Sequence, residues 1–339
     1  MKAAVVYGEL DLRLEDREMP SIKCPDDVLI RVRAVGICGS DSAILRGLNP
    51  FVSYPRVMGH EFVGEVVEFG SDVRDLEQGE HVVIEPITYG GKSFACRRSM
   101  PNVSEDLKVN GVHVDGGMQE YIVIKSIQVH RIGKDIPWTT AVLCEPYTIG
   151  GNSTTRGGVM AGDTVLVQGA GPIGITILRV ARAKGASVMV TDLVDSKLEF
   201  AKECGASRVV NTKREDLEES VRDWTHGEMA NVVLDAVGTP ETFRACFNLT
   251  SVAGTIVVLG MTEKTTPVPQ KPIMAKQLTI CGTRLQAYQF EPIIHLMENG
   301  VIGDEGLVSH AFPFERIQDA FDLVFNHPEQ ARKVVLTFD

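Results

Sequence analysis

The stretch from Thr164 to Asp192 constrains the fold of this chain more than any other part of the sequence. A short apolar segment, 164–168, leads directly into a turn with three glycines, 169–174. Apolar residues at helical spacing follow over 175–184, and 187–191 is a second short apolar segment with Asp192 at its carboxyl end. Strand, glycine turn, helix, strand and acid, in this order, predict a βαβ unit that binds a dinucleotide.

The residues of the glycine turn are the predicted cofactor contacts. Gly169 permits the tight turn, Gly171 lets the backbone approach the pyrophosphate, and Gly174 lets the helix pack closely on the strand. Pro172 and Ile173 lie between the second and third glycines, and the amino terminus of the helix that follows faces the phosphates. We therefore expect all five residues to contact the cofactor.

Asp192 bears on which dinucleotide binds. It lies 18 residues beyond Gly174, close to the separation of about twenty that is typical of this unit. A carboxylate there accepts hydrogen bonds from the ribose 2′-hydroxyl of NAD and repels the 2′-phosphate of NADP. Because Leu193, Val194 and Asp195 bring no arginine to offset that repulsion, the sequence predicts NAD.

Strands and helices continue to alternate after this unit, which predicts a Rossmann-type doubly wound parallel sheet within an α/β protein. About six strands are expected in the domain 149–284. The predicted segments that follow Asp192 are strands at 208–210, 232–235, 255–259 and 278–281 and a helix at 215–224. Beyond residue 284, two helices (290–299 and 316–326) and a last strand (333–336) form a tail, which we expect to return to the first domain.

The sequence of residues 1–148 indicates an irregular β domain, which we expect the tail 285–339 to complete. Short strands with alternating or mainly apolar residues are separated by Gly, Pro, Asp and Asn, as turns require. Few segments have helical periodicity. The predicted strands are 28–35, 62–70, 79–85 and 121–124.

A possible metal site lies within this β domain. His60 and Glu61 are adjacent, and Cys38 lies in its own glycine-framed turn. Thiolate, imidazole and carboxylate are good Zn²⁺ ligands, and three protein ligands leave a position open for water or substrate. Glu145 is a candidate fourth ligand, so we hypothesise a catalytic zinc held by Cys38, His60, Glu61 and Glu145. Taken singly, the same residues are better explained as a small buried cysteine, a core histidine and a surface glutamate.

Composition excludes several other functions. A formal net charge of −11 over 339 residues argues against nucleic acid or an anionic membrane as the main partner. The amino terminus lacks the features of a signal peptide, and no apolar run is long enough to cross a bilayer. Seven widely spread cysteines are expected to be reduced thiols in a cytoplasmic protein.

Four motifs in order resemble the zinc-dependent medium-chain alcohol and polyol dehydrogenases over nearly the whole chain. The motifs are Gly36-Ile-Cys38-Gly-Ser40-Asp41, Gly59-His60-Glu61, Glu145-Pro146 and the turn Gly169–Gly174. The resemblance implies a GroES-like β-barrel catalytic domain, a Rossmann domain and a cleft between them. It also implies that Cys38, His60 and Glu61 hold the zinc, with Glu145 binding it directly or through its water. Alcohol dehydrogenases proper carry a cysteine at the position of Glu145, so the resemblance favours a polyol substrate.

The resemblance also suggests roles for three further residues. Ser40 would pass a proton from the substrate towards solvent through the nicotinamide ribose. Asp41 would orient a metal ligand, although an aspartate that caps the turn is an equal alternative. Arg284 resembles the family's pyrophosphate contact, with an ordinary surface arginine as the alternative.

The segment 86–104 departs from the family pattern. Relatives place four zinc-binding cysteines where this chain has Gly90, Ser93, Cys96 and Ser104. A structural zinc requires four Cys or His ligands. We therefore predict no structural zinc and one catalytic zinc for each chain. The chain is expected to form a dimer or tetramer, although the altered segment often lies near subunit contacts in relatives.

Loop motifs suggest the substrate. Segments 46–51, 54–57 and 111–117 resemble bacterial hexonate dehydrogenases, namely L-galactonate and L-gulonate 5-dehydrogenases and the starvation-sensing RspB-like proteins. We expect oxidation of a secondary hydroxyl of a sugar acid by NAD, with Arg46 or Arg56 binding the substrate carboxylate. The alternatives are an uncharged polyol or secondary alcohol, such as sorbitol, butanediol or threonine, and, in another class, a zinc-free nucleotide-binding sensor. Exact substrate, stereochemistry and direction of reaction stay open.

Overall fold

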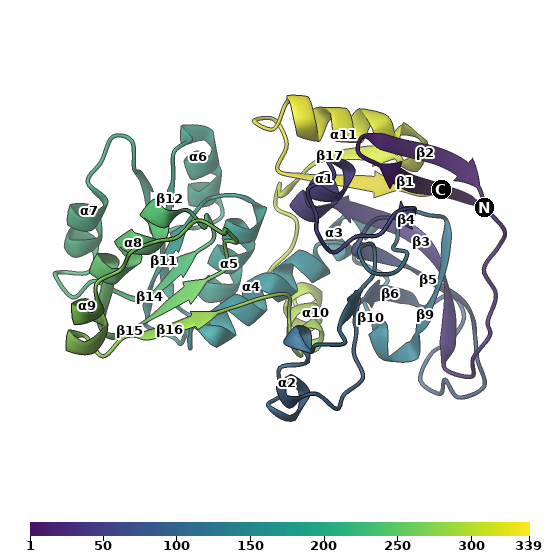
Figure 1. The fold of residues 1–339 in the computed structure, drawn as a ribbon, viewed down its shortest axis with the longest axis horizontal. Coiled ribbons are helices and arrows are strands. Elements are labelled where there is room, and N and C mark those ends of the chain that lie inside the picture. The colour runs from purple at the N-terminus through teal and green to yellow at the C-terminus, as the bar shows by residue number, and fades with distance from the viewer. The chain divides into compact units, whose positions relative to one another are not determined.

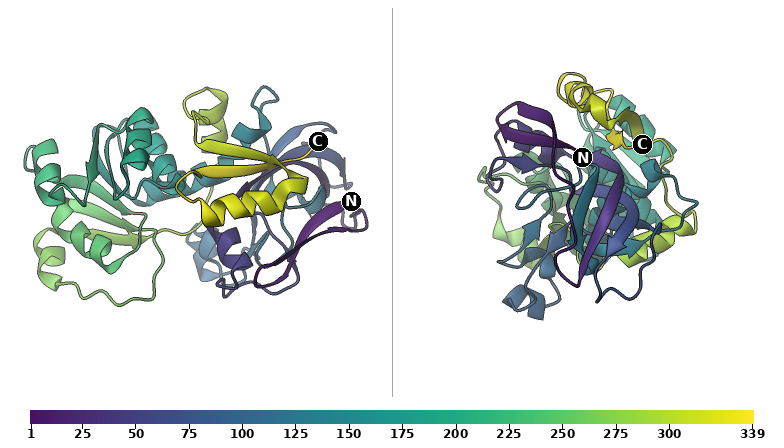
Figure 2. Two further views of the ribbon diagram at one scale, coloured as in Figure 1. Left: turned by 90° about the horizontal axis from the view of Figure 1, so that it is seen from above. Right: turned by 90° about the vertical axis from the view of Figure 1, so that its right-hand side faces the viewer.

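The computed structural model describes all 339 residues, and its internal contacts divide the chain into two units. Unit 1 comprises Met1–Glu145 together with Phe290–Asp339, and unit 2 comprises Pro146–Gln289. The sequence predicted the boundaries at 148/149 and 284/285. Both chain ends belong to unit 1, where they lie close together (Figures 1 and 2).

Unit 2 contains a six-stranded parallel sheet in the order β13-β12-β11-β14-β15-β16. This order places the first strand in the middle and winds the chain outwards in both directions, which is the doubly wound arrangement that the sequence predicted. The strands are β11 (Thr164–Gln168), β12 (Ser187–Asp192), β13 (Arg208–Asn211), β14 (Ala230–Asp235), β15 (Thr250–Val258) and β16 (Thr279–Gly282).

Helices cover both faces of this sheet (Figure 1). Val221 of α7 and Phe247 of α8 pack in one buried cluster with Leu166, Met189 and Val233 of the strands. The helix that follows the glycine turn, α5, contacts β11 and β12. The helices are α4 (Cys144–Arg156), α5 (Pro172–Ala183), α6 (Asp195–Glu203), α7 (Leu217–Trp224), α8 (Pro240–Leu249) and α9 (Gln270–Ala275).

The glycine turn has the backbone geometry that the sequence pattern required. Gly169 has a φ of +100°, a conformation that side chains other than hydrogen rarely permit. A Cβ atom on Gly174 would lie 1.9 Å from the carbonyl oxygen of Gly169, so any larger residue would separate the helix from the strand. The helix begins at Pro172 rather than at the predicted Ile175, because proline suits the first helical position, where no amide hydrogen is needed.

Unit 1 is organised around β3, the longest strand of a seven-stranded sheet. Strands β5, β9 and β18 all pair with β3 in antiparallel fashion. Since β18 belongs to the carboxyl-terminal tail, the tail completes this sheet as predicted, and α11 packs against β17 and β18 (Figure 2). The strands are β3 (Asp27–Ile37), β5 (Glu61–Phe69), β6 (His81–Ile84), β9 (Tyr121–Lys125), β10 (Val129–Arg131), β17 (Val308–Pro313) and β18 (Lys333–Thr337).

Smaller elements complete unit 1. Strands β1 (Lys2–Gly8), β2 (Asp11–Asp16) and β4 (Arg56–Val57) form a three-stranded sheet, and β7 (Ile87–Thr88) pairs with β8 (Lys108–Val109). The helices are α1 (Gly39–Leu45), α2 (Phe94–Arg97), α3 (Trp138–Ala141), α10 (Phe290–Glu298) and α11 (Ile317–Asn326). Helices of four to seven residues show too little periodicity to be found in the sequence. None of the helices is both long and apolar enough to span a bilayer.

Candidate active site

Strand pairing brings the three predicted metal-binding residues together. Cys38 directly follows β3, Glu61 begins β5, and Gly36 of β3 is the register partner of Glu61. One donor atom from each of Cys38, His60 and Glu61 lies within 4.8 Å of the other two. We call these three residues the donor cluster. His60 is 7% and Glu61 1% exposed, so both are buried, and Cys38 is partly exposed.

Asp41 contacts both segments that carry the predicted metal-binding residues. Its carboxylate accepts hydrogen bonds from the backbone nitrogens of Cys38 (2.8 Å) and Gly59 (3.2 Å), which connects the two segments that carry the donors. The first of these bonds also caps the start of α1. Asp41 Oδ1 lies 3.8 Å from Nδ1 of His60, on the side from which a carboxylate orients a metal-binding histidine. Asp41 is therefore a positioning residue for Cys38 and His60.

Lys333 was missed by sequence reasoning. Its Nζ atom lies 2.7 Å from both carboxylate oxygens of Glu61 and is fully buried with them. Burial alone would lower the pKa of Lys333, but Glu61 and Cys38 outweigh burial and raise it. The available signal was a single lysine at the start of the otherwise apolar strand 333–336. Glu61 is thus held by an internal cation, which no local pattern indicated.

Glu145 lies in the first turn of α4 and is 6% exposed. Burial raises the pKa of Glu145 to about 7, His60 opposes this rise, and Glu61 adds to it. These influences show that its carboxyl group belongs to the same electrostatic environment as the donor cluster. It is not one of the three residues with donor atoms within 4.8 Å of one another. The structure therefore places the predicted fourth ligand in the neighbourhood of the cluster, outside its tightest part.

Zinc fits this set of residues on chemical grounds. The cluster offers sulfur, nitrogen and oxygen donors, the types that Zn²⁺ prefers. The Nδ1 atom of His60 makes no hydrogen bond but faces Asp41 Oδ1 at 3.8 Å, so the fit rests on the types of donor rather than on this atom. Ser40 Oγ lies 3.5 Å from the other ring nitrogen, Nε2, so the serine lies beside the cluster.

The loop 111–118 supports the segment that carries His60. The backbone nitrogens of Gly116, Gly117 and Met118 donate hydrogen bonds to the carbonyls of residues 57, 59 and 58 respectively. A Cβ atom on Gly116 would lie 2.1 Å from the carbonyl oxygen of Gly59, so only glycine permits this approach. The structural role of this motif is therefore to hold the histidine segment in place.

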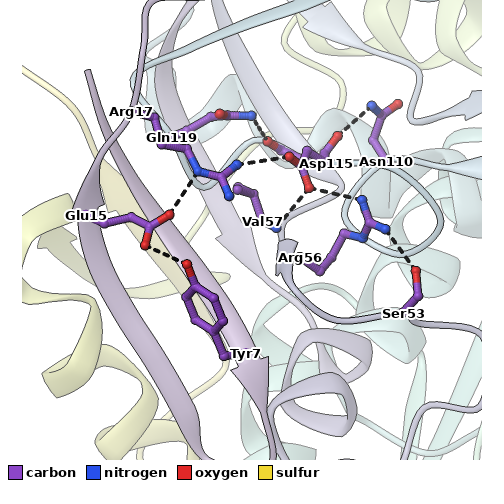
Figure 3. A network of polar contacts seen from close by, with 10 residues as sticks. Tyr7, Glu15, Arg17, Ser53, Arg56, Val57, Asn110, Asp115 and Gln119 are labelled. Carbon is purple, nitrogen blue, oxygen red and sulfur yellow. Dashed lines mark hydrogen bonds and ion pairs between the residues drawn. The ribbon is translucent and has the colours of Figure 1, made fainter.

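The two arginines predicted to bind a substrate carboxylate have other partners. The guanidinium of Arg56 donates to Asp115 Oδ1 (3.0 Å), and Arg17 contacts the second carboxylate oxygen at 3.2 Å. Figure 3 shows the two guanidinium groups on opposite sides of Asp115. The guanidinium of Arg46 lies 4.3 Å from the ring centre of Phe325. Both guanidinium groups therefore have interactions within unit 1, and carboxylate binding by either arginine stays a prediction.

The predicted cofactor residues of unit 2 also lie together. The amino terminus of α5 has no side-chain cap, and a Cβ atom on Gly171 would meet nothing within 4 Å, so the backbone there is open to a phosphate. Asp192 Oδ2 accepts a hydrogen bond from the backbone nitrogen of Ala170 at 2.9 Å, inside the turn. Ile173 and Arg284 line one cavity of about 420 Å³. These features fit a dinucleotide at the carboxyl edge of the sheet.

Comparisons with known proteins agree with this geometry. A family model described as alcohol dehydrogenase GroES-like domain matches residues 24–134, and one described as zinc-binding dehydrogenase matches residues 172–299. The starvation-sensing protein RspB of Escherichia coli K12 is 37% identical and covers 100% of this chain and 99% of its own length. The L-galactonate-5-dehydrogenase of the same organism is 32% identical with the same coverage.

Solved structures show the same similarity. The alcohol dehydrogenase rspB from E. coli CFT073, in complex with NADH, superposes with a TM-score of 0.94 at 37% identity and covers 100% of this chain and 99% of its own. The 2R,3R-butanediol dehydrogenase of Bacillus subtilis superposes with a TM-score of 0.92 at 27% identity and covers 99% of each chain. By fold, site and similarity over its whole length, the chain belongs to the zinc-type alcohol and polyol dehydrogenases, oxidoreductases that act on CH–OH groups with zinc and NAD.

Proposed function

We propose that this protein oxidises a secondary hydroxyl of a sugar acid, a hexonate such as L-galactonate or L-gulonate, to the keto acid while NAD accepts the hydride. The donor cluster of Cys38, His60 and Glu61 supports the proposal that a hydroxyl is the reacting group. The choice of a hexonate is supported by the 32% identical L-galactonate-5-dehydrogenase, which aligns over the whole chain.

Cys38, His60 and a carboxylate from Glu61 or Glu145 would hold the zinc. When bound there, zinc supplies a Lewis acid that lowers the pKa of the substrate hydroxyl. Asp41 keeps the backbone of Cys38 in place, and Lys333 keeps the Glu61 carboxylate in place. Ser40 Oγ, 3.5 Å from His60 Nε2, is the hydroxyl in position to accept the substrate proton and pass it onwards.

The cofactor turn of unit 2 would bind the hydride acceptor. The uncapped amino terminus of α5 and the open space at Gly171 suit the pyrophosphate. Asp192 suits the ribose hydroxyls, and Arg284 would contact the pyrophosphate from the neighbouring cavity.

An uncharged polyol or secondary alcohol is the second candidate substrate. The observation in its favour is that Arg56 is bound to Asp115 and that Arg46 stacks on Phe325, so neither guanidinium is held ready for a carboxylate. Other relatives act on such substrates by their names, including the sorbitol dehydrogenase of B. subtilis (29% identical) and the (R,R)-butanediol dehydrogenase of Neisseria gonorrhoeae (30% identical). A zinc-free sensor has no use for a buried donor cluster, so nothing in the site favours it.

A substrate panel tests the proposal. Aldonates and polyols are incubated with NAD⁺, and NADH formation is followed by absorbance. We expect turnover with a hexonate and weaker turnover with polyols; turnover with polyols alone would favour the second candidate. If Arg46→Ala and Arg56→Ala both leave KM for the hexonate unchanged, neither arginine binds its carboxylate.

The metal site needs a separate test. Cys38→Ser and His60→Ala should each abolish turnover, because each removes a donor that the zinc requires. NADH binding, measured by its fluorescence, should survive in both variants because unit 2 is unchanged. Full turnover by either variant would contradict the assignment of the donor cluster as the catalytic site.

A further inference from the structure

An ion pair lies beside the predicted 2′-hydroxyl contact of the cofactor. The guanidinium of Arg214 donates to Asp195 Oδ2 at 2.6 Å. The other carboxylate oxygen of Asp195 accepts a hydrogen bond from the side-chain amide of Asn211, also at 2.6 Å. The sequence interpretation considered only residues 193–195 and found no arginine there; the fold brings Arg214 to the same place from the next loop.

Register places this ion pair at the edge where the adenosine half of a dinucleotide binds. Strands β12 and β13 are parallel neighbours, with Asp192 opposite Asn211. The loops that follow them are connected, because Thr212 donates its backbone nitrogen to the carbonyl of Asp192 at 3.3 Å. Asp195 begins α6 and Arg214 follows β13, so both lie at the carboxyl ends of the strands, where ligands bind in such sheets.

Asp192 itself is firmly held. Its Oδ1 atom accepts hydrogen bonds from the backbone nitrogens of Leu193 (2.7 Å) and Val194 (3.1 Å), and Oδ2 accepts one from Ala170. These bonds keep the carboxylate facing the glycine turn, where it can receive a ribose hydroxyl.

Arg214 has the chemistry that a 2′-phosphate requires. A guanidinium binds phosphate with paired hydrogen bonds, and an arginine near this position is how related sheets accommodate NADP. Here the guanidinium is already bound to a carboxylate. A 2′-phosphate would have to compete with Asp195 for Arg214 and would also meet its negative charge.

We propose that Asp195 is a second determinant of the preference for NAD over NADP, acting by binding and neutralising Arg214. Asp192 recognises the 2′-hydroxyl, and Asp195 withholds the cation that would otherwise attract a 2′-phosphate. The inference rests on the dinucleotide binding of the proposed function but not on the substrate.

The test is equilibrium binding of NADH and NADPH to the intact protein, measured by fluorescence at low salt in the absence of substrate. Asp195→Asn removes the charge that binds Arg214 while keeping an oxygen that can accept from Asn211. Because hydrogen bonds between a guanidinium and an anion are strong but this site is exposed, we expect NADPH affinity to rise about three- to tenfold. NADH affinity should change by less than about twofold, since NADH carries no 2′-phosphate.

Two controls distinguish the specific effect of Asp195 on NADPH binding from the effect of a general change in charge. The double variant Asp195→Asn/Arg214→Ala should lose the gain in NADPH affinity, because the freed cation is then absent. Glu218→Gln removes the carboxylate partner of Arg222, another exposed ion pair of unit 2 at 2.9 Å, and should leave the ratio of the two affinities unchanged. The gain in Asp195→Asn should also shrink as salt is added.

Specific outcomes overturn the inference. An unchanged NADH to NADPH affinity ratio in Asp195→Asn would do so, and so would a gain that persists in the double variant. A wild-type protein that prefers NADPH would also overturn it. Binding of neither dinucleotide by the wild-type protein would instead overturn the dinucleotide use of the proposed function, and this inference with it.

Discussion

Two regions of unit 1 lie where the family places metal ligands. They differ in whether their polar side chains already have hydrogen-bond partners within the chain. The donor cluster of Cys38, His60 and Glu61 is largely buried, and its donor atoms lie within 4.8 Å of one another. Nδ1 of His60 has no hydrogen-bond partner. Within the cluster, Glu61 is bound by Lys333, and this ring nitrogen is left without a hydrogen bond.

The second region, residues 90–106, is called the lobe here. Its four positions corresponding to zinc-binding cysteines in relatives are connected by hydrogen bonds instead. Ser104 Oγ lies 2.9 Å from Ser93 Oγ and 3.5 Å from Cys96 Sγ. Asp106 then accepts hydrogen bonds from Ser104 Oγ at 2.5 Å and from the backbone nitrogen of Gly90 at 2.9 Å.

The difference lies in how the polar groups of each region are paired. Hydroxyl groups and a carboxylate satisfy each other with directional hydrogen bonds and need no ion. A thiol, an imidazole and a carboxylate crowded together in a buried place do not satisfy each other to the same degree, and the ion supplies the remaining interactions. The predictions below test this contrast, beginning with the largest expected effect.

Zinc content provides the sharpest test. The wild-type protein should carry about one zinc for each chain. The other group with donor atoms this close, Cys24 with Asp26 and Asp27, has both carboxylates bound by Lys125 and offers no histidine. Cys38→Ser should lower the content towards zero, and Cys96→Ser in the lobe should leave it unchanged, as measured by elemental analysis. Two tightly bound zincs, or a loss caused by Cys96→Ser, would remove the contrast between the two regions.

The buried cation beside the donor cluster should matter strongly for stability. Lys333→Met leaves Glu61 buried with its positive partner removed, which typically costs about 3 kcal/mol or more. Chemical denaturation of the zinc-loaded protein measures this loss. Adding Glu61→Gln to Lys333→Met should recover part of it.

A matched control for Lys333 exists at the surface of the same unit. Lys125 contacts Asp26 at 2.7 Å and Asp27 at 2.8 Å but is 40% exposed. Lys125→Met should cost less than about 1 kcal/mol, because water solvates Asp26 and the buried Asp27 keeps hydrogen bonds from the backbone nitrogens of Lys23 and Cys24. Equal losses for the two lysines would show that burial of the Glu61 pair is not what matters.

Removing the carboxylate of Asp106 should loosen the lobe alone. Asp106→Asn weakens the bonds to Gly90 and Ser104. Amide hydrogen exchange in the lobe should become severalfold faster, and zinc content and turnover should stay as in the wild type. Loss of zinc from this variant would show that the lobe and the donor cluster are coupled.

In a third polar cluster of unit 1, a histidine is paired with two carboxylates. Its contribution to stability should depend on pH. His130 lies 3.2 Å from Glu85 and 2.9 Å from Glu291. Burial alone would lower the pKa of His130, but the two carboxylates outweigh it and raise the pKa. The stabilisation by these ion pairs is therefore fully present below about pH 6.5, the pKa of histidine in the unfolded chain. It is lost as the pH rises through the higher pKa of His130 in the folded protein.

His130→Gln tests this direction. The variant should be less stable than the wild type by about 1 kcal/mol or less at pH 6, and the difference should shrink at pH 9. Denaturation curves at the two pH values measure it, with His295→Gln on the exposed side of α10 as the matched control. A difference that grows with pH would have the wrong sign.

Much of the fold follows from patterns that are local in the sequence. The strand at 164–168 has the bounds that its apolar residues predicted. The glycine turn and the position of Asp192 could also be predicted, because short-range backbone geometry leaves few alternatives there. The sequence suggested that Cys38, His60 and Glu61 lie together only because their residue types suit one metal site. In the structure, pairing of β3 with β5 brings them together. Short helices such as α1 were missed because few residues cannot establish a period.

The sequence by itself therefore determined the doubly wound sheet, the cofactor turn and the types of metal-binding residue, since each depends on neighbours along the chain. Only the tertiary structure decided which distant charges meet. Lys333 binds Glu61, Asp115 binds Arg56, and Asp195 binds Arg214. The reason is physical: an ion pair forms wherever the fold brings opposite charges within contact, and no spacing rule in one dimension encodes that meeting.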